Sequence, residues 1–111
     1  MNKLVKEAHE NAVAHGWWEE DRSFGEVIAL MHSELSEALE EYRAGRGFTE
    51  IYYTTDKQGQ QKPEGIPIEL ADEVIRIFDA CGRYGIDLNE AVSIKMEYNK
   101  SRPYKHGDKV I

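Results

Sequence analysis

Apolar side chains recur at helical spacing over four stretches of the chain, and residues that start or stop helices bound each stretch. The first stretch covers residues 2–15 and ends at Gly16. The second opens at Ser23 and Glu26, which have the spacing of a capping box, and it ends at Gly45. Its apolar stripe is the longest in the chain and comprises Phe24, Val27, Ile28, Met31, Leu35, Ala38, Leu39 and Tyr42.

Two further helices are predicted in the second half of the chain. The third starts near Pro67, which suits a first helical turn, and ends at Gly85, where we expect a left-handed cap. Its predicted apolar stripe comprises Leu70, Val74, Phe78 and Cys81, widened by Ile75 and Ile77. The fourth helix opens at a capping box formed by Asp87 and Glu90, and Pro103 ends it.

Residues 48–62 interrupt the helical pattern. A β-branched and aromatic run at 51–55 precedes the turn-like sequence DKQG, which predicts a short β-hairpin. We therefore expect residues 1–111 to form a single all-α domain, a bundle of about four helices with this hairpin inserted. The apolar faces of the second and third helices are too wide for one small protomer to cover, so we expect a homodimer or homotetramer to complete the core.

The charge balance restricts the ligands that the chain can bind. The 21 acidic and 14 basic residues give a net charge of -7, so the chain as a whole repels nucleic-acid polymers. A phosphate ligand would need a local group of cations, a divalent metal ion, or both. The single cysteine, Cys81, and the lack of any signal-peptide or transmembrane pattern predict a cytoplasmic protein that does not associate with membranes.

Two pairs of acidic residues share one spacing: Glu34 with Glu37, and Glu69 with Asp72. On two antiparallel helices such pairs could direct four carboxylates into one volume, which requires a cation to offset their repulsion. Oxygen ligands without thiolates or paired histidines favour Mg²⁺, with Mn²⁺ as the alternative. The same spacing also occurs on solvated helix faces, where Glu69 would favour the helix dipole and Asp72 could pair with Arg76. Spacing alone leaves both interpretations open.

The fourth predicted helix changes its chemistry along one face. Its apolar stripe consists of Leu88, Ala91 and Val92. The same face continues as Lys95, Asn99 and Arg102, whereas a solvated charged stripe should lie opposite the apolar one. This arrangement favours a pocket that meets an anion such as a polyphosphate. In the alternative interpretation, Lys95 and Arg102 only extend their aliphatic stems beside neighbouring glutamates.

Four blocks of the chain, taken in order, carry a resemblance to a known family. They are ELSE (34–37), ELADEVIRIFD (69–79), GIDLNEAV (85–92) and KMEYNKSRPYKHG (95–107). Together these blocks resemble the MazG-like, all-α nucleoside triphosphate pyrophosphohydrolases over about residues 23–111. The last two blocks, in that order, are the more specific part of the resemblance.

The family's metal motif is an EExxE block followed by an ExxD block. Glu34 and Glu37 match the last two glutamates of the first block, and Glu69 and Asp72 match the second block. Ser33 stands where the first glutamate would be, so the number of metal ions, one or two, stays open. The two blocks lie further apart than is usual in the family, and the predicted hairpin accounts for the difference.

The resemblance implies Mg²⁺-dependent hydrolysis of a nucleoside triphosphate to the monophosphate and pyrophosphate, with a role in removing unwanted nucleotides. The four carboxylates would hold the metal, and an activated water would attack the α-phosphorus. Lys95, Asn99 and Arg102 would hold the triphosphate, supplemented by Tyr104 and Lys105. No separate general base stands out in the sequence, although one of the glutamates could serve.

Two adjacent tryptophans, Trp17 and Trp18, follow the first predicted helix. One reading is that they stack on a nucleobase, with Trp17 as the candidate contact. The other is that one tryptophan is in the core and its neighbour is half exposed. Elsewhere, Asp79 is predicted to pair with Arg83 at i+4, and His9 belongs to no recognisable cluster.

Two other functions stay open at this point. A related hydrolase could use the same metal site on dUTP or on an alarmone. A non-catalytic helical module could instead bind a nucleotide or a partner protein, and the missing first glutamate at Ser33 favours this reading. No residue reads a base edge convincingly, so the sequence predicts no base preference.

Overall fold

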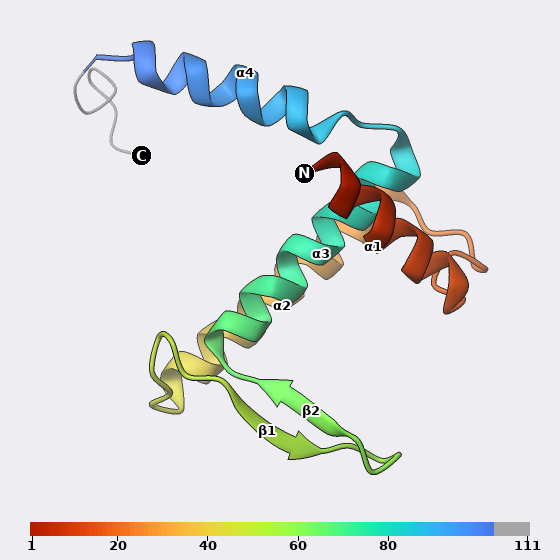
Figure 1. The fold of residues 1–111 in the computed structure, drawn as a ribbon, viewed down its shortest axis with the longest axis vertical. Helices are drawn as coiled ribbons and strands as arrows, with labels where there is room; N and C mark the ends of the chain where they lie inside the picture. The colour runs from red at the N-terminus through yellow and green to blue at the C-terminus, as the bar shows by residue number, and fades with distance from the viewer. Residues whose placement is uncertain (104–111) are drawn as a thin grey trace.

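The computed structural model describes residues 1–103, which form four helices and a two-stranded sheet (Figure 1). The elements in chain order are α1 (Asn2–Ala14), α2 (Phe24–Arg43), β1 (Tyr52–Thr55), β2 (Gln61–Glu64), α3 (Ile66–Tyr84) and α4 (Leu88–Ser101). This order confirms a mostly helical fold with an inserted hairpin. Within residues 1–103, none of the helices is long and apolar enough to cross a membrane.

The helix ends follow local chemistry that the sequence predicts. The Glu26 amide donates to Ser23 Oγ at 3.0 Å at the start of α2, and the Glu90 amide donates to Asp87 Oδ1 at 3.0 Å at the start of α4. Each bond satisfies a backbone donor that has no partner within its helix. Gly85 follows α3 with a φ of 69°, in the left-handed conformation expected there.

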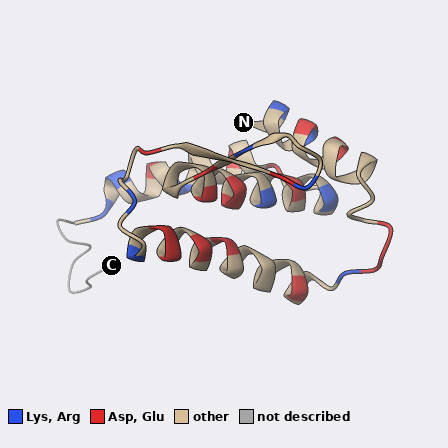
Figure 2. Ribbon diagram, turned by 90° about the horizontal axis from the view of Figure 1, so that it is seen from below, with Lys and Arg blue, Asp and Glu red and all other residues tan. Residues whose placement is uncertain are grey.

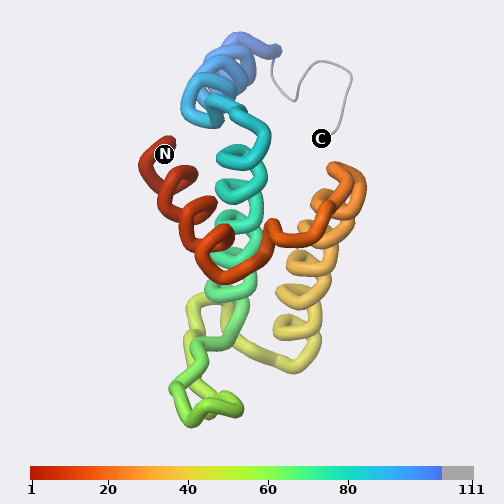
Figure 3. Tube along the Cα trace, turned by 90° about the vertical axis from the view of Figure 1, so that its right-hand side faces the viewer, coloured from red at the N-terminus to blue at the C-terminus, as the bar shows by residue number. Residues whose placement is uncertain are grey.

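Helix α3 is the central element, and α1 and α2 pack against different sides of it (Figure 3). Gly82 allows the close approach of α1, because a Cβ at this position would lie 2.5 Å from the Cβ of His9. Val5 of α1 and Cys81 of α3 are both buried. Acidic residues recur along α2 and α3, which run side by side (Figure 2).

The buried face of α3 differs from the predicted one. Leu70 and Val74 were predicted to face the core, but they are 47% and 44% exposed. Instead Glu69 and Arg76 point towards α2, where they meet acidic residues of that helix. The prediction was wrong for the first half of the helix, because α2 offers a charged partner for the polar stripe there, while nothing in the described protomer covers Leu70 and Val74. The later part of the predicted stripe is confirmed at Cys81, which is buried, and Phe78 is half-buried.

The hairpin is tied to both neighbouring helices at its base. Its strands are antiparallel, with Tyr52 opposite Glu64. The Tyr52 hydroxyl lies 2.9 Å from both carboxylate oxygens of Glu41 on α2, and the Arg46 guanidinium lies 3.8 Å from the centre of the Tyr52 ring. Gly65, with a φ of 121°, leads directly from β2 into α3. The hairpin therefore fixes the start of the helix that carries Glu69.

Helix α4 has few contacts with the rest of the protomer. Near its start, the Asn2 side chain donates to Asp87 Oδ1 at 3.1 Å and accepts from the Asn89 amide at 3.2 Å. None of its residues is buried, although Leu88 and Val92 are half-buried. Figures 1 and 3 show α4 beyond the end of the α2–α3 pair rather than beside it.

Candidate metal centre

Three carboxylates meet between α2 and α3: those of Glu34, Glu37 and Glu69. One oxygen from each lies within 4.8 Å of the others. Glu34 and Glu69 are only 7% and 8% exposed, whereas Glu37, one turn further along α2, is exposed to solvent. The structure thus brings together three of the four acidic residues that the sequence singles out. Two of them are buried, and the third borders solvent.

Asp72, the fourth acidic candidate, lies one turn beyond Glu69 on α3. Its side chain is exposed and lines a cavity that Glu34 also lines. Partial burial, and then the negative charge of Glu34, raise the pKa of Asp72 above its ordinary value. Asp72 is therefore an electrostatic neighbour of the three glutamates, but it stands outside their tight cluster.

Glu69 carries the strongest sign that the cluster suits a cation. Burial raises the pKa of Glu69 to about 7, with further contributions from the close carboxylate of Glu37 and the charges of Asp72 and Glu34. Its Oε2 atom is buried and has no hydrogen-bond partner among the described residues. Since buried polar atoms are nearly always satisfied, an orphaned carboxylate oxygen beside two other carboxylates suits a ligand of a positive ion.

Glu73 adds a carboxylate that the sequence analysis missed. Its Oε2 atom is also buried without a partner among the described residues. Burial, and then the charge of Glu34, raise the pKa of Glu73 above its ordinary value. It was missed because it directly follows Asp72 and so falls outside the ExxD spacing. Its four-residue separation from Glu69 is the signal that places both residues on one helical face.

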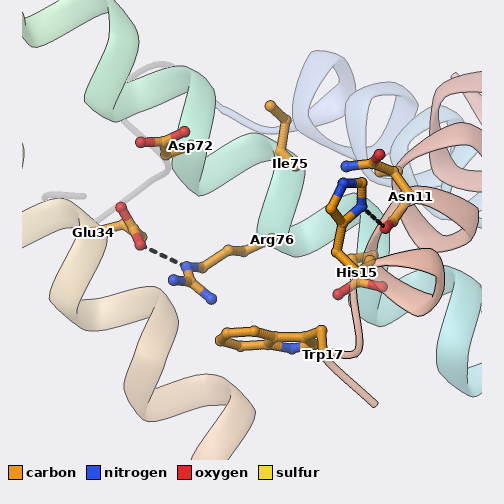
Figure 4. Close-up of a pocket in the computed structure, with 10 residues that line it drawn as sticks. Asn11, His15, Trp17, Glu34, Asp72, Ile75 and Arg76 are labelled. Atoms are coloured by element: carbon orange, nitrogen blue, oxygen red, sulfur yellow. Dashed lines mark hydrogen bonds and ion pairs between the residues drawn. The ribbon is translucent and has the colours of Figure 1, made fainter. Parts of the chain in front are cut away.

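Arg76 is the counter-ion within this interface. Its Nε donates to Glu34 Oε1 at 2.6 Å, although the sequence had suggested Asp72 as the partner (Figure 4). This single guanidinium pairs with Glu34, while the same interface also holds the buried carboxylate of Glu69 and the half-buried one of Glu73. The middle of the α2–α3 interface therefore has an excess of negative charge when these groups are ionised. A divalent cation would offset that excess, and protonation is the alternative.

A cavity of about 350 Å³ adjoins the carboxylates (Figure 4). Its walls come from α1, α2, α3 and the segment after α1, and it shares Glu34 and Asp72 with the candidate site. Trp17 and His15 lie on the opposite side from these acids. The guanidinium of Arg76 lies 4.8 Å from the centre of the Trp17 ring. The cavity thus joins a flat aromatic surface to the acidic cluster.

Trp18 has a structural role that sets it apart from Trp17. Its Nε1 donates to Asp79 Oδ1 at 2.9 Å, and the same oxygen lies 2.8 Å from His9 Nδ1. Asp79 therefore does not pair with Arg83 as predicted, and His9 does belong to a cluster. Arg83 instead stacks on the Trp18 ring, 4.9 Å from its centre. These contacts join residues up to 70 positions apart, which helical spacing cannot reveal.

The predicted cationic residues lie elsewhere in the protomer. Lys95 and Arg102 both approach the ring of Tyr98, at 4.7 and 5.5 Å from its centre, and Asn99 is exposed nearby on α4. Within one copy of the chain, α4 has no extensive contact with α2 or α3. The structure does not bring these cations to the carboxylates of the same copy. The remaining candidates, Tyr104 and Lys105, lie outside the described residues.

Comparisons of the chain with protein-family models, with curated proteins and with solved structures find no match. The interpretation of the site therefore depends on its geometry and on the four sequence blocks described above. That geometry defines a helical domain with a largely buried carboxylate cluster, open on one side to a cavity that Trp17 lines.

Proposed function

We propose that the protein is a Mg²⁺-dependent nucleoside triphosphate pyrophosphohydrolase of the MazG-like kind. The observation that supports this most directly is the buried Oε2 atom of Glu69, which has no partner within residues 1–103, in a carboxylate that clusters with those of Glu34 and Glu37. A carboxylate cluster with too few cations, next to a cavity, is the chemistry that a metal-dependent phosphate enzyme requires. Mn²⁺ would suit the same oxygen ligands.

Each acidic residue of the site has a proposed role in metal binding or in proton transfer. Glu34, Glu37 and Glu69 would hold the metal, with Asp72 at the cavity side. When bound, Mg²⁺ would neutralise phosphate oxygens and lower the pKa of the attacking water. The water oxygen bonds to the α-phosphorus, the bond from that phosphorus to the bridging oxygen breaks, and pyrophosphate leaves. In this proposal Asp72, which lines the cavity and has a raised pKa, would accept the proton from the water.

The cavity offers a place for the nucleoside part of the substrate. Its volume of about 350 Å³ is within the range of small-ligand pockets. Trp17 supplies an aromatic wall, and the cavity reaches the carboxylates through Glu34 and Asp72. In this proposal Lys95, Asn99 and Arg102 hold the triphosphate. A role in removing unwanted nucleotides follows from the same resemblance.

A second candidate function is a module that binds a metal–nucleotide complex without hydrolysing it. Ser33 favours this alternative, because it replaces the first glutamate of the family motif. Its hydroxyl donates to the Leu30 carbonyl at 2.6 Å and is exposed, so it adds no ligand to the cluster. The site would then hold fewer ions than a complete motif holds.

A substrate panel tests the proposal. The full chain is incubated with common and damaged nucleoside triphosphates, with dUTP and with a guanosine alarmone, in Mg²⁺ or Mn²⁺, and the products are identified by chromatography. We expect a nucleoside monophosphate and pyrophosphate. Turnover confined to dUTP or the alarmone would narrow the substrate class instead. Stabilisation by Mg²⁺ and nucleotide without any turnover would select the binding module.

Two variants on α2 test whether pyrophosphate release depends on the carboxylate cluster. Glu37→Gln removes a carboxylate of the cluster and should abolish pyrophosphate release. Glu40→Gln, three residues further along α2, removes only an exposed partner of Arg43 and should retain activity. Equal activity in the two variants would count against the assigned site.

A further inference from the structure

Arg76 uses only part of its guanidinium group in the contact with Glu34. Its Nε atom donates to Glu34 Oε1 at 2.6 Å, which is a one-point contact rather than the two-point fork that an arginine can form with a carboxylate. Its terminal nitrogens, Nη1 and Nη2, donate no hydrogen bond within residues 1–103. The side chain is 30% exposed and lines the cavity beside the carboxylate cluster. Arg76 therefore keeps most of its N–H donors for another acceptor.

Two neighbours hold the guanidinium of Arg76 in place. It lies between the Glu34 carboxylate and the Trp17 ring, 4.8 Å from the centre of that ring (Figure 4). Trp17 is restrained in turn by Arg22, whose Nε donates to the Trp17 carbonyl at 3.1 Å and whose guanidinium lies 4.1 Å from the ring centre. Arg22 also pairs with Glu26 at 2.8 Å. Donors that are held in position before a ligand binds need little reorganisation when it does.

Arg76 also supplies positive charge to the cavity. Among the described residues that line the cavity, Arg76 is the only lysine or arginine, whereas Glu34, Asp72 and Asp79 all carry carboxylates. Such carboxylates repel an anionic ligand unless a cation lies beside it. An anion in this cavity would therefore lie next to Arg76, next to a metal ion on the glutamates, or between the two.

The position of Arg76 between the two parts of the site identifies the phosphate that it would meet. Glu34 belongs both to the carboxylate cluster and to the cavity wall, and Arg76 lines the same wall. A nucleotide with its nucleoside in the cavity and its triphosphate at the cluster would cross from one part to the other at Glu34. The α-phosphate is the phosphate attached to the nucleoside, so it would lie at this crossing. Its nearest cationic side chain would be the guanidinium that Glu34 holds.

We propose that Arg76 is a substrate-binding residue whose terminal nitrogens donate to non-bridging oxygens of the α-phosphate. This inference rests on the proposed function, and it adds a phosphate ligand from the same copy of the chain as the carboxylates. Attack of water on the α-phosphorus increases the negative charge on these oxygens, and fixed donors stabilise that charge. Arg76 neither gains nor loses a proton, because the water proton goes to Asp72 and pyrophosphate leaves as in the proposed reaction.

The variant Arg76→Lys separates phosphate binding from simple charge balance. Lysine keeps a positive charge near Glu34 but lacks the planar fork of donors. We expect kcat to fall by about 10²-fold or more, while the circular dichroism stays that of a folded helical protein. Arg43→Lys is the matched control and should keep its kcat, because Arg43 pairs only with the exposed Glu40 on α2. A folded Arg76→Lys that keeps more than about one third of the wild-type kcat would overturn the proposal.

Phosphorothioate substrates test the contact in the wild-type protein, without any substitution. The substrate is the triphosphate that the panel shows to be hydrolysed fastest, and each of its two α-thio diastereomers has sulfur in place of one non-bridging α-oxygen. Sulfur at an oxygen that the metal binds slows the reaction in Mg²⁺ and less so in Mn²⁺, which accepts soft ligands more readily. Sulfur at an oxygen that Arg76 binds slows the reaction equally in both ions, because the lost hydrogen bond does not involve the metal.

We expect one of the two diastereomers to be slowed in Mg²⁺ and Mn²⁺ alike, and Arg76→Lys to remove most of that effect. Arg43→Lys should leave it unchanged. Wild-type rates for both diastereomers that recover in Mn²⁺ would contradict the contact. The same holds if the metal-independent effect persists at full size in Arg76→Lys.

Binding of a non-hydrolysable nucleotide separates this inference from the proposed function. The wild type and Arg76→Lys are titrated with α,β-methylene ATP and with α,β-methylene dUTP in Mg²⁺ by calorimetry. We expect Arg76→Lys to bind at least one of them about 10-fold more weakly. If the wild type releases pyrophosphate from triphosphates, and Arg76→Lys equals it in both affinity and kcat, the proposed function stands and this inference fails.

The reverse result is also distinguishable. If the wild type binds an analogue more tightly than Arg76→Lys does but hydrolyses no triphosphate, Arg76 holds phosphate in a binding module and the hydrolase assignment fails. Equal binding by the two proteins, or no binding by either, without any hydrolysis would overturn both.

Discussion

Arg76 on α3 donates to Glu34 on α2 at 2.6 Å, in the middle of the interface between the two helices. Its side chain is 30% exposed, and that of Glu34 is 9% exposed. Removing a partner from a largely buried pair leaves the other charge without compensation. Arg76→Met should therefore lower the free energy of unfolding by about 1–3 kcal/mol, which is less than for a fully buried pair. Urea unfolding without divalent metal measures the change.

Arg43→Met is the matched control for this variant. Arg43 pairs with Glu40 on the same helix, but both side chains are about two-thirds exposed. The free energy of unfolding should change by less than about 0.5 kcal/mol. Mg²⁺ should stabilise Arg76→Met more than it stabilises the wild type, because the variant has a larger excess of negative charge. An equal loss of unfolding free energy in Arg76→Met and Arg43→Met would contradict the burial of the Arg76–Glu34 pair.

The raised pKa of Glu69 predicts how stability depends on pH without metal. Its pKa is about 7 in the folded chain, against an ordinary value of 4.5. Between these values the folded state binds more protons than the unfolded state, so the free energy of unfolding should fall as pH rises. The raised pKa values of Asp72 and Glu73 act in the same direction.

Urea unfolding in the presence of a chelator, at about pH 5 and about pH 7.5, measures how the free energy of unfolding changes with pH. Glu69→Gln should flatten this dependence, because the amide does not ionise. Added Mg²⁺ should stabilise most at the higher pH, where the carboxylates are ionised and available. Glu50 and Asp87 have lowered pKa values, so they affect stability below this window. A free energy of unfolding that rises through the window would refute the assigned environment of Glu69.

Gly82→Ala should destabilise the packing of α1 on α3. The new Cβ would lie 2.5 Å from the His9 Cβ, a distance that requires α1 to move. We expect a loss of about 1–3 kcal/mol from overpacking, although alanine favours a helix by about 1 kcal/mol over glycine. Gly25→Ala on α2 is the control, since its nearest neighbour is Ser23 Oγ at 3.8 Å. That variant should be as stable as the wild type or slightly more so.

Asp72→Asn should abolish pyrophosphate release and leave the fold intact. Asp72 is exposed and makes no hydrogen bond among the described residues, so its amide removes charge without disturbing packing. The circular dichroism and melting temperature should match those of the wild type or exceed them slightly. Asp21→Asn, in the segment between α1 and α2, is a control that should retain full activity. An unfolded Asp72→Asn would show that this residue is structural.

Local chemistry explains which parts of the fold were predictable. The capping residues Ser23 and Asp87, the left-handed Gly85 and the hairpin all depend on neighbours within a few positions. The structure has the caps and Gly85 where they were predicted, and it has the hairpin too, although β2 runs to Glu64, two residues beyond the predicted range. The buried face of α3 was not predictable in this way. Leu70 and Val74 form a regular apolar stripe that the sequence predicts to be buried. Which face of α3 is in fact buried depends on the helix that packs against it, and both residues are exposed.

In the candidate site, too, sequence spacing predicts neighbours within one helix but not contacts between helices. Spacing within α2 and within α3 identified Glu34, Glu37 and Glu69, which the structure brings together. It did not identify Arg76 as the partner of Glu34, because the two residues are 42 positions apart and the angle between the helices fixes their contact. Glu73 was missed for a different reason. The family's motif directs attention to Asp72, and Glu73, the next residue, falls outside the ExxD spacing.

The single cysteine gives this protein a built-in reporter. Cys81 is 6% exposed and lies beneath α1, and burial raises the pKa of its thiol, so the reactive thiolate is scarce. A thiol-specific dye should label it slowly while α1 stays packed on α3, and faster when α1 lifts away. The labelling rate therefore follows the opening of the N-terminal helix in the unmodified chain, and it can be compared with and without nucleotide.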